Sequence, residues 1–228
     1  MKISALAMGA LALTATTPAI AGDLNGAGAS FPAPIYQRWF KDYADKTGNQ
    51  VNYQAVGSGA GVRQYKAGTT DFGASDKAVS DKKLSGISRP MVQIPMTGGA
   101  IAVAYNKPGC DLKLTQTEVA QVFYGRINNW SHFGCGDTPI TIAVRSDGSG
   151  TTAGFTNSLS AFSIYWDVRV GRGKSVNWPG SNTVAGKGNS GVAGIIKNTP
   201  GAIGYLNYGY VVGDRFQQAA IKNKAGNY

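Results

Sequence analysis

Apolar and polar positions alternate along the chain with two different spacings. Between residues 35 and 43 the large apolar side chains recur at helical spacing, with prolines before them and Gly48 after them. This pattern predicts a helix, because proline is tolerated in a first turn and glycine ends helices. Residues 51–56 instead alternate apolar and polar, which is typical of a strand. The same reasoning predicts strands at 24–27, 71–76, 140–144 and 202–210, and helices at 62–67, 115–123, 152–162 and 192–197.

Two segments add detail to this pattern. Thr115 precedes an apolar run and Glu118 follows three residues later, a capping-box pattern that favours a helix start. Residues 91–105 are mostly apolar and are interrupted by Gly98 and Gly99, so we expect a buried strand pair or a crossover there. Strands, loops and helices that follow one another in this order indicate an α/β fold with mostly parallel sheets.

The start of the chain has a different character. Lys2 is followed by an apolar run from about Ile3 to Leu13 and then by Pro18-Ala19-Ile20-Ala21, which is the layout of a secretory signal peptide. The run is shorter than the about 20 residues that span a bilayer. We expect residues 1–21 to be a cleaved signal peptide, which predicts export to the periplasm. The alternative is a buried N-terminal helix.

The chain has two cysteines, Cys110 and Cys135, and one histidine, His132. An exported chain meets an oxidising compartment, where an even pair of cysteines usually closes. We therefore expect a disulfide, with two unpaired thiols as the alternative. These side chains are too few for a zinc site, and no other metal site and no cofactor is predicted.

The charge of the chain narrows the class of partner. With 22 Lys and Arg against 12 Asp and Glu, the net charge is +10, which favours an anionic partner such as phosphate, sulfate, nucleic acid or acidic lipid. The basic residues are scattered, whereas proteins that bind nucleic acids usually cluster them on one face or in an arm. The charge therefore indicates an anion without saying which one.

Three short loops that contain Gly and Ser each follow an expected strand and open an expected helix. They are residues 28–31, 57–59 and 147–151. A helix N-terminus exposes unpaired N–H groups and the positive end of the macrodipole, and glycine lets the backbone approach a ligand. A serine at such a place is often only a helix cap. Three such loops in one basic, exported chain indicate a shared anion site.

Two kinds of charged residue beside these loops bear on the identity of the anion. Arg145 offers a planar fork for two oxygens of a tetrahedral oxyanion, and Asp147 could steady it; the alternative is a surface ion pair. Asp76 would repel an anion unless the ligand carries a proton that its carboxylate can accept. Phosphate carries that proton at neutral pH and sulfate does not, so Asp76 would select against sulfate. Taken alone, Asp76 is more often a turn or capping residue.

Several segments, in this order, also point to a known family: Leu24-Asn25-Gly26-Ala27-Gly28-Ala29-Ser30-Phe31-Pro32-Ala33-Pro34, Gly57-Ser58-Gly59, Asp71-Phe72-Gly73-Ala74-Ser75-Asp76, Arg145-Ser146-Asp147-Gly148-Ser149-Gly150-Thr151, Val176-Asn177-Trp178-Pro179 and Pro200-Gly201-Ala202-Ile203-Gly204-Tyr205. Together they resemble the phosphate-binding protein of the bacterial phosphate ABC importer. The first segment also resembles the related DING proteins, although it departs from their Gly-Gly-Gly-Ala-Thr pattern.

The resemblance implies a two-lobed periplasmic binding protein (type II) fold that closes on one phosphate. It also implies a set of ligand contacts, with Asp76 as the acceptor carboxylate and Asp147 linked to Arg145. A disulfide between Cys110 and Cys135 is not a general feature of the family. The phosphate-binding residues that the resemblance implies are Ser30, Phe31, Ser58, Asp76, Arg145, Ser149, Gly150 and Thr151.

Family members are longer, and in them the chain returns to the first lobe and completes it. The domain organisation that we expect is therefore a signal peptide at 1–21, an incomplete first lobe at 22–97 that lacks this C-terminal return, and a second lobe at 98–228.

The implied function is high-affinity binding of inorganic phosphate in the periplasm and its delivery to the membrane permease subunits of an ABC-type importer. The protein would act as a monomer, without enzymatic activity and without nucleic acid. One alternative is a DING-like phosphatase, which needs a nucleophile and an activating base or metal. Another is a basic surface adhesin or nucleic-acid binder.

Overall fold

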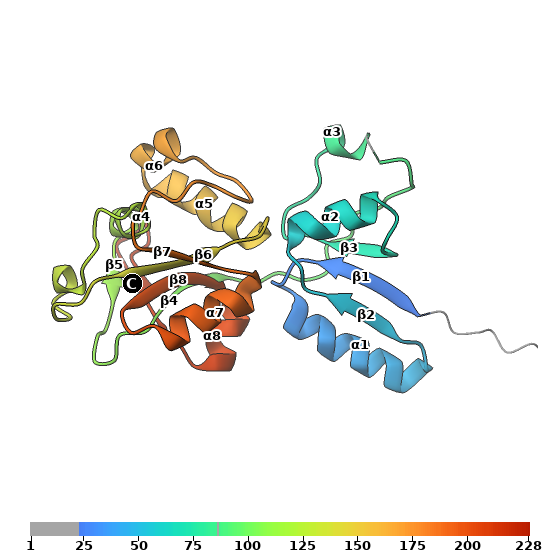
Figure 1. The fold of residues 1–228 in the computed structure, drawn as a ribbon, viewed down its shortest axis with the longest axis horizontal. Helices are drawn as coiled ribbons and strands as arrows, with labels where there is room; N and C mark the ends of the chain where they lie inside the picture. The colour runs from blue at the N-terminus through green and yellow to red at the C-terminus, as the bar shows by residue number, and fades with distance from the viewer. Residues whose placement is uncertain (1–22, 86) are drawn as a thin grey trace, which may run out of the picture.

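The computed structural model describes residues 23–85 and 87–228, and the predicted signal peptide at 1–21 lies outside the described residues. The chain forms two lobes, each built around its own β-sheet (Figure 1). None of the helices formed by the described residues has both the length and the apolar character needed to cross a membrane.

The first lobe is a three-stranded sheet flanked by helices. Its strands lie in the order β2-β1-β3, and β1 pairs in parallel with both neighbours. A short helix, α3, follows the last strand. The elements are β1 (Leu24–Gly28), α1 (Ala33–Thr47), β2 (Val51–Gln54), α2 (Ser58–Lys66), β3 (Phe72–Ala74) and α3 (Asp81–Leu84).

The second lobe holds a five-stranded sheet in the order β7-β6-β8-β4-β9. Helices α4, α5 and α6 lie on one side of this sheet, and α7 and α8 lie on the other (Figure 1). A small separate sheet pairs β5 with β10. The elements are β4 (Ile101–Tyr105), β5 (Lys113–Leu114), α4 (Gln116–Tyr124), η1 (Trp130–Phe133), β6 (Thr141–Arg145), α5 (Gly150–Phe162), α6 (Ile164–Arg169), β7 (Thr183–Gly186), α7 (Gly188–Asn198), β8 (Ala202–Asn207), α8 (Tyr208–Asp214), β9 (Gln217–Gln218) and β10 (Ala220–Ile221).

Strand direction explains where the loops after the strands gather. Strands β6, β7 and β8 run parallel to one another, so their carboxyl ends lie at the same edge of the sheet, facing the first lobe (Figure 1). Strand β4 pairs antiparallel with β8, since it begins where the chain arrives from the first lobe and runs away from it. The second sheet is therefore mixed: β7, β6 and β8 are parallel, and β4 is antiparallel to its two neighbours, β8 and β9.

The buried core is unevenly divided between the lobes. Among the described residues, both clusters of buried hydrophobic side chains belong to the second lobe. In the larger cluster, the ring of Tyr205 stacks on that of Phe155 at 4.4 Å between centroids, and Phe155 meets Phe123 edge-on at 4.6 Å. The first lobe has a group of aromatic rings from α1, β2 and β3, of which only Tyr36 is buried.

Three expectations from the sequence need correction. Of the two alternatives for residues 91–105, the buried strand pair is wrong: only Ile101–Tyr105 is a strand, and residues 91–100 have no regular structure and connect the first lobe to β4. Val92 is 83% exposed and Ile94 is 68% exposed, so this segment is not buried. The strand expected at 202–210 ends at Asn207, whose side chain accepts a hydrogen bond from the Gly209 N–H and so starts α8. Three helices begin earlier than expected: α2 begins at Ser58, α5 at Gly150 and α7 at Gly188.

Two local expectations are confirmed. Thr115 and Glu118 form the reciprocal capping box at the start of α4. Cys110 and Cys135 form a disulfide, with their Cα atoms 5.5 Å apart. Because Cys110 is buried within the larger hydrophobic cluster, the bridge ties the segment that carries β5, α4 and η1 to the core.

Candidate functional site

Four helix N-termini face one another between the lobes. Helices α1 and α2 start at the edge of the first lobe that faces the second, and α5 and α7 start at the opposing edge of the second lobe (Figure 1). Each of these ends presents N–H groups that have no acceptor within their own helix. The four macrodipoles add positive potential at one place, which suits a negatively charged ligand.

Ser30 lies just before α1 and is bound by groups of the second lobe. Its Oγ accepts hydrogen bonds from the backbone N and the side-chain Nδ2 of Asn189, each at 3.0 Å. Its carbonyl accepts a hydrogen bond from the Tyr210 hydroxyl at 2.8 Å. Ser30 and Asn189 are both almost fully buried. The loop that opens α1 is therefore held from the second lobe at two of its atoms.

Ser58, at the start of α2, connects both lobes in a similar way. Its Oγ accepts hydrogen bonds from the backbone N–H of Asp76, at 3.3 Å, and from the backbone N–H of Gly150, at 3.2 Å. Next to it, the Gly59 N–H donates to the Gly148 carbonyl at 2.7 Å. Ser58 is fully buried. The second and third predicted loops thus meet directly across the lobe boundary.

Asp76 faces the start of α5. The Thr151 hydroxyl donates to its Oδ2 at 3.2 Å. The residue as a whole is exposed, but its carboxyl group lies against the Gly150 backbone. Loss of water around that carboxyl raises the pKa of Asp76, and this effect outweighs the hydrogen bond from Thr151 and the positive charges of Arg145 and Lys174. Asp76 is therefore a carboxylate in a site otherwise rich in donors.

Arg145 ends β6 with its side chain buried and oriented by a carboxylate. Its Nε donates to Asp147 Oδ1 at 2.8 Å, and its Nη2 donates to Oδ2 at 2.5 Å. The Gly188 N–H also donates to Asp147 Oδ1. Burial by itself would raise the pKa of Asp147, but the hydrogen bonds from Arg145 and Gly188 outweigh it and lower that pKa. The pair is buried, with 2% of the Arg145 side chain exposed, so it is not a surface ion pair.

The remaining predicted residues flank this cluster. The Ser149 Oγ caps α5 by accepting a hydrogen bond from the Thr152 N–H at 3.0 Å. Phe31 is half-buried, and its ring lies beside Gly99. All the phosphate-binding candidates lie at the facing edges of the lobes. The hydrogen bonds above form three neighbouring groups: Ser30 with Asn189, Arg145 with Asp147 and Gly188, and a group made of Ser58, Asp76, Gly150 and Thr151.

Sequence reasoning missed the contribution of α7. Gly188-Asn189-Ser190-Gly191 is a fourth segment rich in Gly and polar residues at a helix start, and it forms the first turn of α7 just after β7. The expected helix at 192–197 started too late to reveal it, because the first turn of α7 carries glycine and polar residues rather than apolar ones. Lys174, whose Nζ donates to Ser75 Oγ at 3.0 Å, was missed as well, since nothing in its local sequence marks it.

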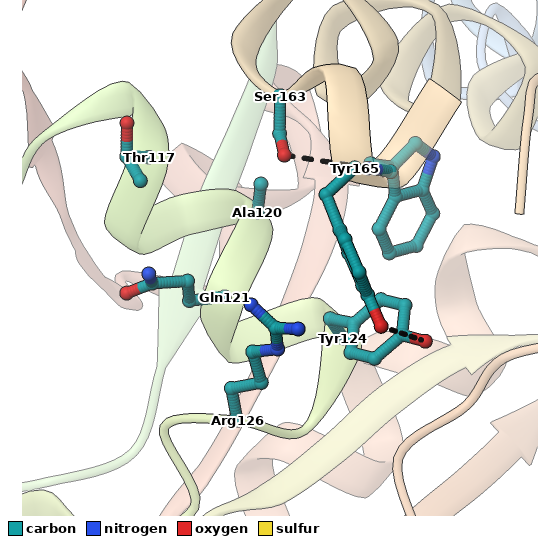
Figure 2. A pocket seen from close by; sticks show the side chains of 8 residues that line it. Thr117, Ala120, Gln121, Tyr124, Arg126, Ser163 and Tyr165 are labelled. Atoms are coloured by element: carbon teal, nitrogen blue, oxygen red, sulfur yellow. Dashed lines mark hydrogen bonds between the residues drawn. The ribbon is translucent and has the colours of Figure 1, made fainter. Parts of the chain in front are cut away.

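A pocket of about 210 Å³ lies on the second lobe between α4 and α6, apart from the site between the lobes. Figure 2 shows Tyr124 and Tyr165 side by side in it, with their hydroxyls 3.2 Å apart. The Arg126 guanidinium lies over the Tyr165 ring, 4.0 Å from its centre. The pocket contains none of the predicted site residues, and we assign it no part in the site between the lobes. Within residues 23–85 and 87–228, no group of three or more His, Cys, Asp or Glu side chains could hold a metal ion.

Curated relatives of this chain are named phosphate-binding proteins. The phosphate-binding protein PstS of Xylella fastidiosa is 40% identical over 218 residues, which cover 90% of this chain and 58% of that protein. PstS of Haemophilus influenzae is 41% identical over 221 residues, which cover 91% of this chain and 65% of that protein. The chain therefore spans less than two thirds of the length of these relatives.

Solved structures match the two-lobed fold. A high-affinity periplasmic phosphate-binding protein (PfluDING) with bound phosphate is 27% identical with a TM-score of 0.71, and the match covers 90% of this chain and 63% of that one. A phosphate-binding protein from Stenotrophomonas maltophilia is 23% identical with a TM-score of 0.70, covering 89% of this chain and 65% of that one. These matches confirm the two-lobed binding-protein fold. A family profile for the PBP superfamily domain matches residues 13–225, nearly the whole chain, and the chain therefore belongs to the PBP superfamily.

Proposed function

We propose that this chain binds inorganic phosphate between its two lobes and delivers it to the permease subunits of an ABC-type phosphate importer. It acts in the periplasm after its signal peptide, residues 1–21, is removed. The lobes comprise residues 22–97 and 98–228. The protein works as a monomer and by binding alone, without turning over a substrate and without nucleic acid. The relatives named PstS and the phosphate-bound neighbour support this proposal.

The donors that would hold the anion come from both lobes. The hydroxyl oxygens of Ser30 and Ser58 each accept two N–H hydrogen bonds, so each keeps its own hydrogen for a further acceptor. Arg145 uses Nε and Nη2 on Asp147, which leaves the N–H groups of Nη1 for oxygens of the ligand. Further donors are the Ser149 hydroxyl, whose oxygen accepts from the Thr152 N–H, and the backbone N–H groups of Phe31 and Thr151. The Gly150 N–H and the Thr151 hydroxyl bond Ser58 and Asp76 in this structure and would exchange these partners for the ligand.

The single observation that carries the choice of phosphate is Asp76. Its carboxylate lies among these donors and against Gly150 and Thr151. An ionised carboxylate only accepts hydrogen bonds, so it favours an oxyanion that carries a proton. Phosphate at neutral pH has that proton, whereas sulfate would bring an oxygen against the carboxylate with no hydrogen between them.

Calorimetric titration of the mature chain, residues 22–228, with phosphate and with sulfate at neutral pH tests this function. We expect heat from phosphate with one site per chain and none from sulfate. Sulfate binding as tight as that of phosphate, or no binding of phosphate, would overturn the proposal. Transport into vesicles that contain the permease subunits, with and without the chain, tests delivery.

A further inference from the structure

Asn189 is a buried side chain at the centre of the contacts between the lobes. It occupies the second position of α7 and is 0% exposed. Each of its polar groups has a partner: the backbone N–H and Nδ2 bond Ser30, Nδ2 also reaches Thr151 Oγ1 at 3.5 Å, and Oδ1 accepts from the Asn207 N–H at 3.0 Å. The residue therefore bridges the loop before α1 to the starts of α5 and α8.

The hydrogen bond from Asn207 fixes which way the Asn189 amide points. A backbone N–H can only donate, so the atom that it meets must be the amide oxygen. The amide nitrogen must then face Ser30 and Thr151. The position of Asn207 is fixed by two contacts: its backbone ends β8, and its side chain caps α8.

This orientation decides what the Ser30 hydroxyl can do. A serine oxygen has two lone pairs and one hydrogen. The backbone N–H and the Nδ2 of Asn189 occupy both lone pairs, each at 3.0 Å. The hydroxyl hydrogen is then free only for an acceptor outside this pair, such as an oxygen of an anion held between the lobes.

We propose that Asn189 is a positioning residue that fixes the Ser30 hydroxyl as a donor to the bound anion and holds the lobes together around it. The proposal rests on the proposed function and adds a residue to the same site. Because Asn189 belongs to the second lobe and Ser30 to the first, the contact exists only while the lobes are closed. Its loss should therefore speed release of the anion more than it slows capture.

The test measures phosphate affinity by calorimetry and phosphate dissociation with radiolabelled phosphate. Relative to the wild type, Asn189→Ala should weaken phosphate binding about 10- to 100-fold. This is the effect of losing one hydrogen bond to a charged group, here the bond from the Ser30 hydroxyl to the anion. Most of this change should appear as faster dissociation. Asn198→Ala, which removes an exposed asparagine from the end of the same helix, should leave both quantities unchanged.

A double-mutant cycle separates positioning from a general structural role. If Asn189 acts through the Ser30 hydroxyl, Ser30→Ala with Asn189→Ala should bind phosphate about as weakly as Ser30→Ala alone. If the loss of phosphate affinity in the double variant equals the product of the losses in the two single variants, the proposal is contradicted. Wild-type affinity in Asn189→Ala, or a loss confined to the association rate, would also contradict it.

Asn189→Asp keeps the shape of the side chain and covers the case in which the alanine variant does not fold. Its second oxygen can only accept, so it would take the Ser30 hydrogen and add a negative charge beside the anion. We expect it to bind phosphate more weakly than Asn189→Ala, and wild-type affinity in this variant would overturn the proposal. Absence of phosphate binding in the wild type would instead refute the proposed function.

Discussion

Ser30, Ser58 and Asp76 show how the role of a single side chain depends on its partners. A serine before a helix is commonly a cap for that helix, yet neither Ser30 nor Ser58 caps the helix that it precedes or begins. Their oxygens accept N–H groups from other segments of the chain instead. The sequence could place these residues at helix starts. Only the tertiary contacts show that the two serine oxygens accept N–H groups and that these bonds do not use the hydroxyl hydrogens.

The first residue-scale prediction concerns Asp76 and sulfate. Burial raises the pKa of Asp76. Above that pKa the carboxylate only accepts hydrogen bonds and rejects sulfate; below it, the carboxyl carries a proton that it can donate. Because the pKa of Asp76 is raised, we expect the sulfate affinity of the wild type to begin rising at a pH above the ordinary aspartate pKa of about 3.9 and to rise further as the pH falls. Calorimetry with sulfate at several pH values measures the effect.

The matched variant for this prediction is Asp76→Asn. Its amide can donate at every pH, so it should bind sulfate with an affinity that does not depend on pH, and its preference for phosphate over sulfate should fall. Unchanged selectivity in this variant would remove Asp76 from the role of discriminating residue.

The second residue-scale prediction concerns the buried ion pair. Asp147→Ala leaves the buried Arg145 guanidinium without its partner, which should lower the free energy of unfolding by about 3–5 kcal/mol at pH 7. The pKa of Asp147 is lowered in the folded protein, so its contribution is present above the unfolded pKa of about 3.9 and is lost as pH falls through the folded pKa. Urea unfolding at several pH values measures this.

A control for this prediction lies on the surface. Asp167 pairs with Arg172 where about half of the arginine side chain is exposed, so water screens the pair and Asp167→Ala should lower the free energy of unfolding far less than Asp147→Ala. Equal losses of unfolding free energy in Asp147→Ala and Asp167→Ala would show that the buried ion pair contributes no more to stability than the exposed one.

At the scale of elements, the sequence located most helices and strands but misplaced several helix starts. Periodicity detects the apolar face of a helix, and the first turns of α2, α5 and α7 instead carry glycine together with serine, threonine or asparagine. These turns are polar because they face the other lobe and the site rather than the core. For the same physical reason, sequence analysis missed the fourth of these helix starts, at residues 188–191 of α7.

The element-scale prediction tests how closely α5 approaches the first lobe. A Cβ at Gly150 would lie 2.5 Å from the Asp76 Cβ and 2.6 Å from its Oδ2. Gly150→Ala should therefore push the lobes apart and weaken phosphate binding roughly 5- to 150-fold, the range that corresponds to an overpacking cost of about 1–3 kcal/mol. Calorimetry measures the loss of affinity.

Gly194→Ala serves as the control for this variant. Gly194 lies inside α7, and a Cβ there would have no atom within 4 Å. Alanine favours a helix over glycine by up to about 1 kcal/mol, so this variant should be slightly more stable and should bind phosphate normally. If Gly150→Ala also binds normally, the close approach of Gly150 and Asp76 is not required for binding.

At the scale of the whole molecule, the two lobes differ in how well their apolar surface is covered. A groove of about 1270 Å³ runs along the first lobe, where it is lined by large apolar side chains of α1 and of residues 87–96, and it reaches the site at Asp76, Gly150 and Thr151. Trp39 and Tyr43 are 38% and 44% exposed there. Both buried hydrophobic clusters of the described residues lie in the second lobe.

This difference predicts unequal local stability. Regions with few buried apolar contacts open more often, so backbone amides of β1, β2 and β3 should exchange with solvent faster than those of β6 and β8. A ligand held by both lobes stabilises the closed state by mass action, and phosphate should therefore slow exchange mainly in the first lobe. Hydrogen-exchange mass spectrometry with and without phosphate measures both effects, and equal exchange in the two lobes would contradict this account.

The sequence by itself determined the α/β class, most elements, the cysteine pair and the loops that carry the candidate site, because helix periods, turn residues and caps are local properties of the chain. The family resemblance that the motifs carry implied a two-lobed fold. Tertiary structure alone decided that four helix N-termini meet, that Arg145 and Asp147 are buried together, and that Asn189 holds Ser30. These contacts join residues as far apart as 159 positions in the chain, and no local pattern encodes a hydrogen bond across a lobe boundary.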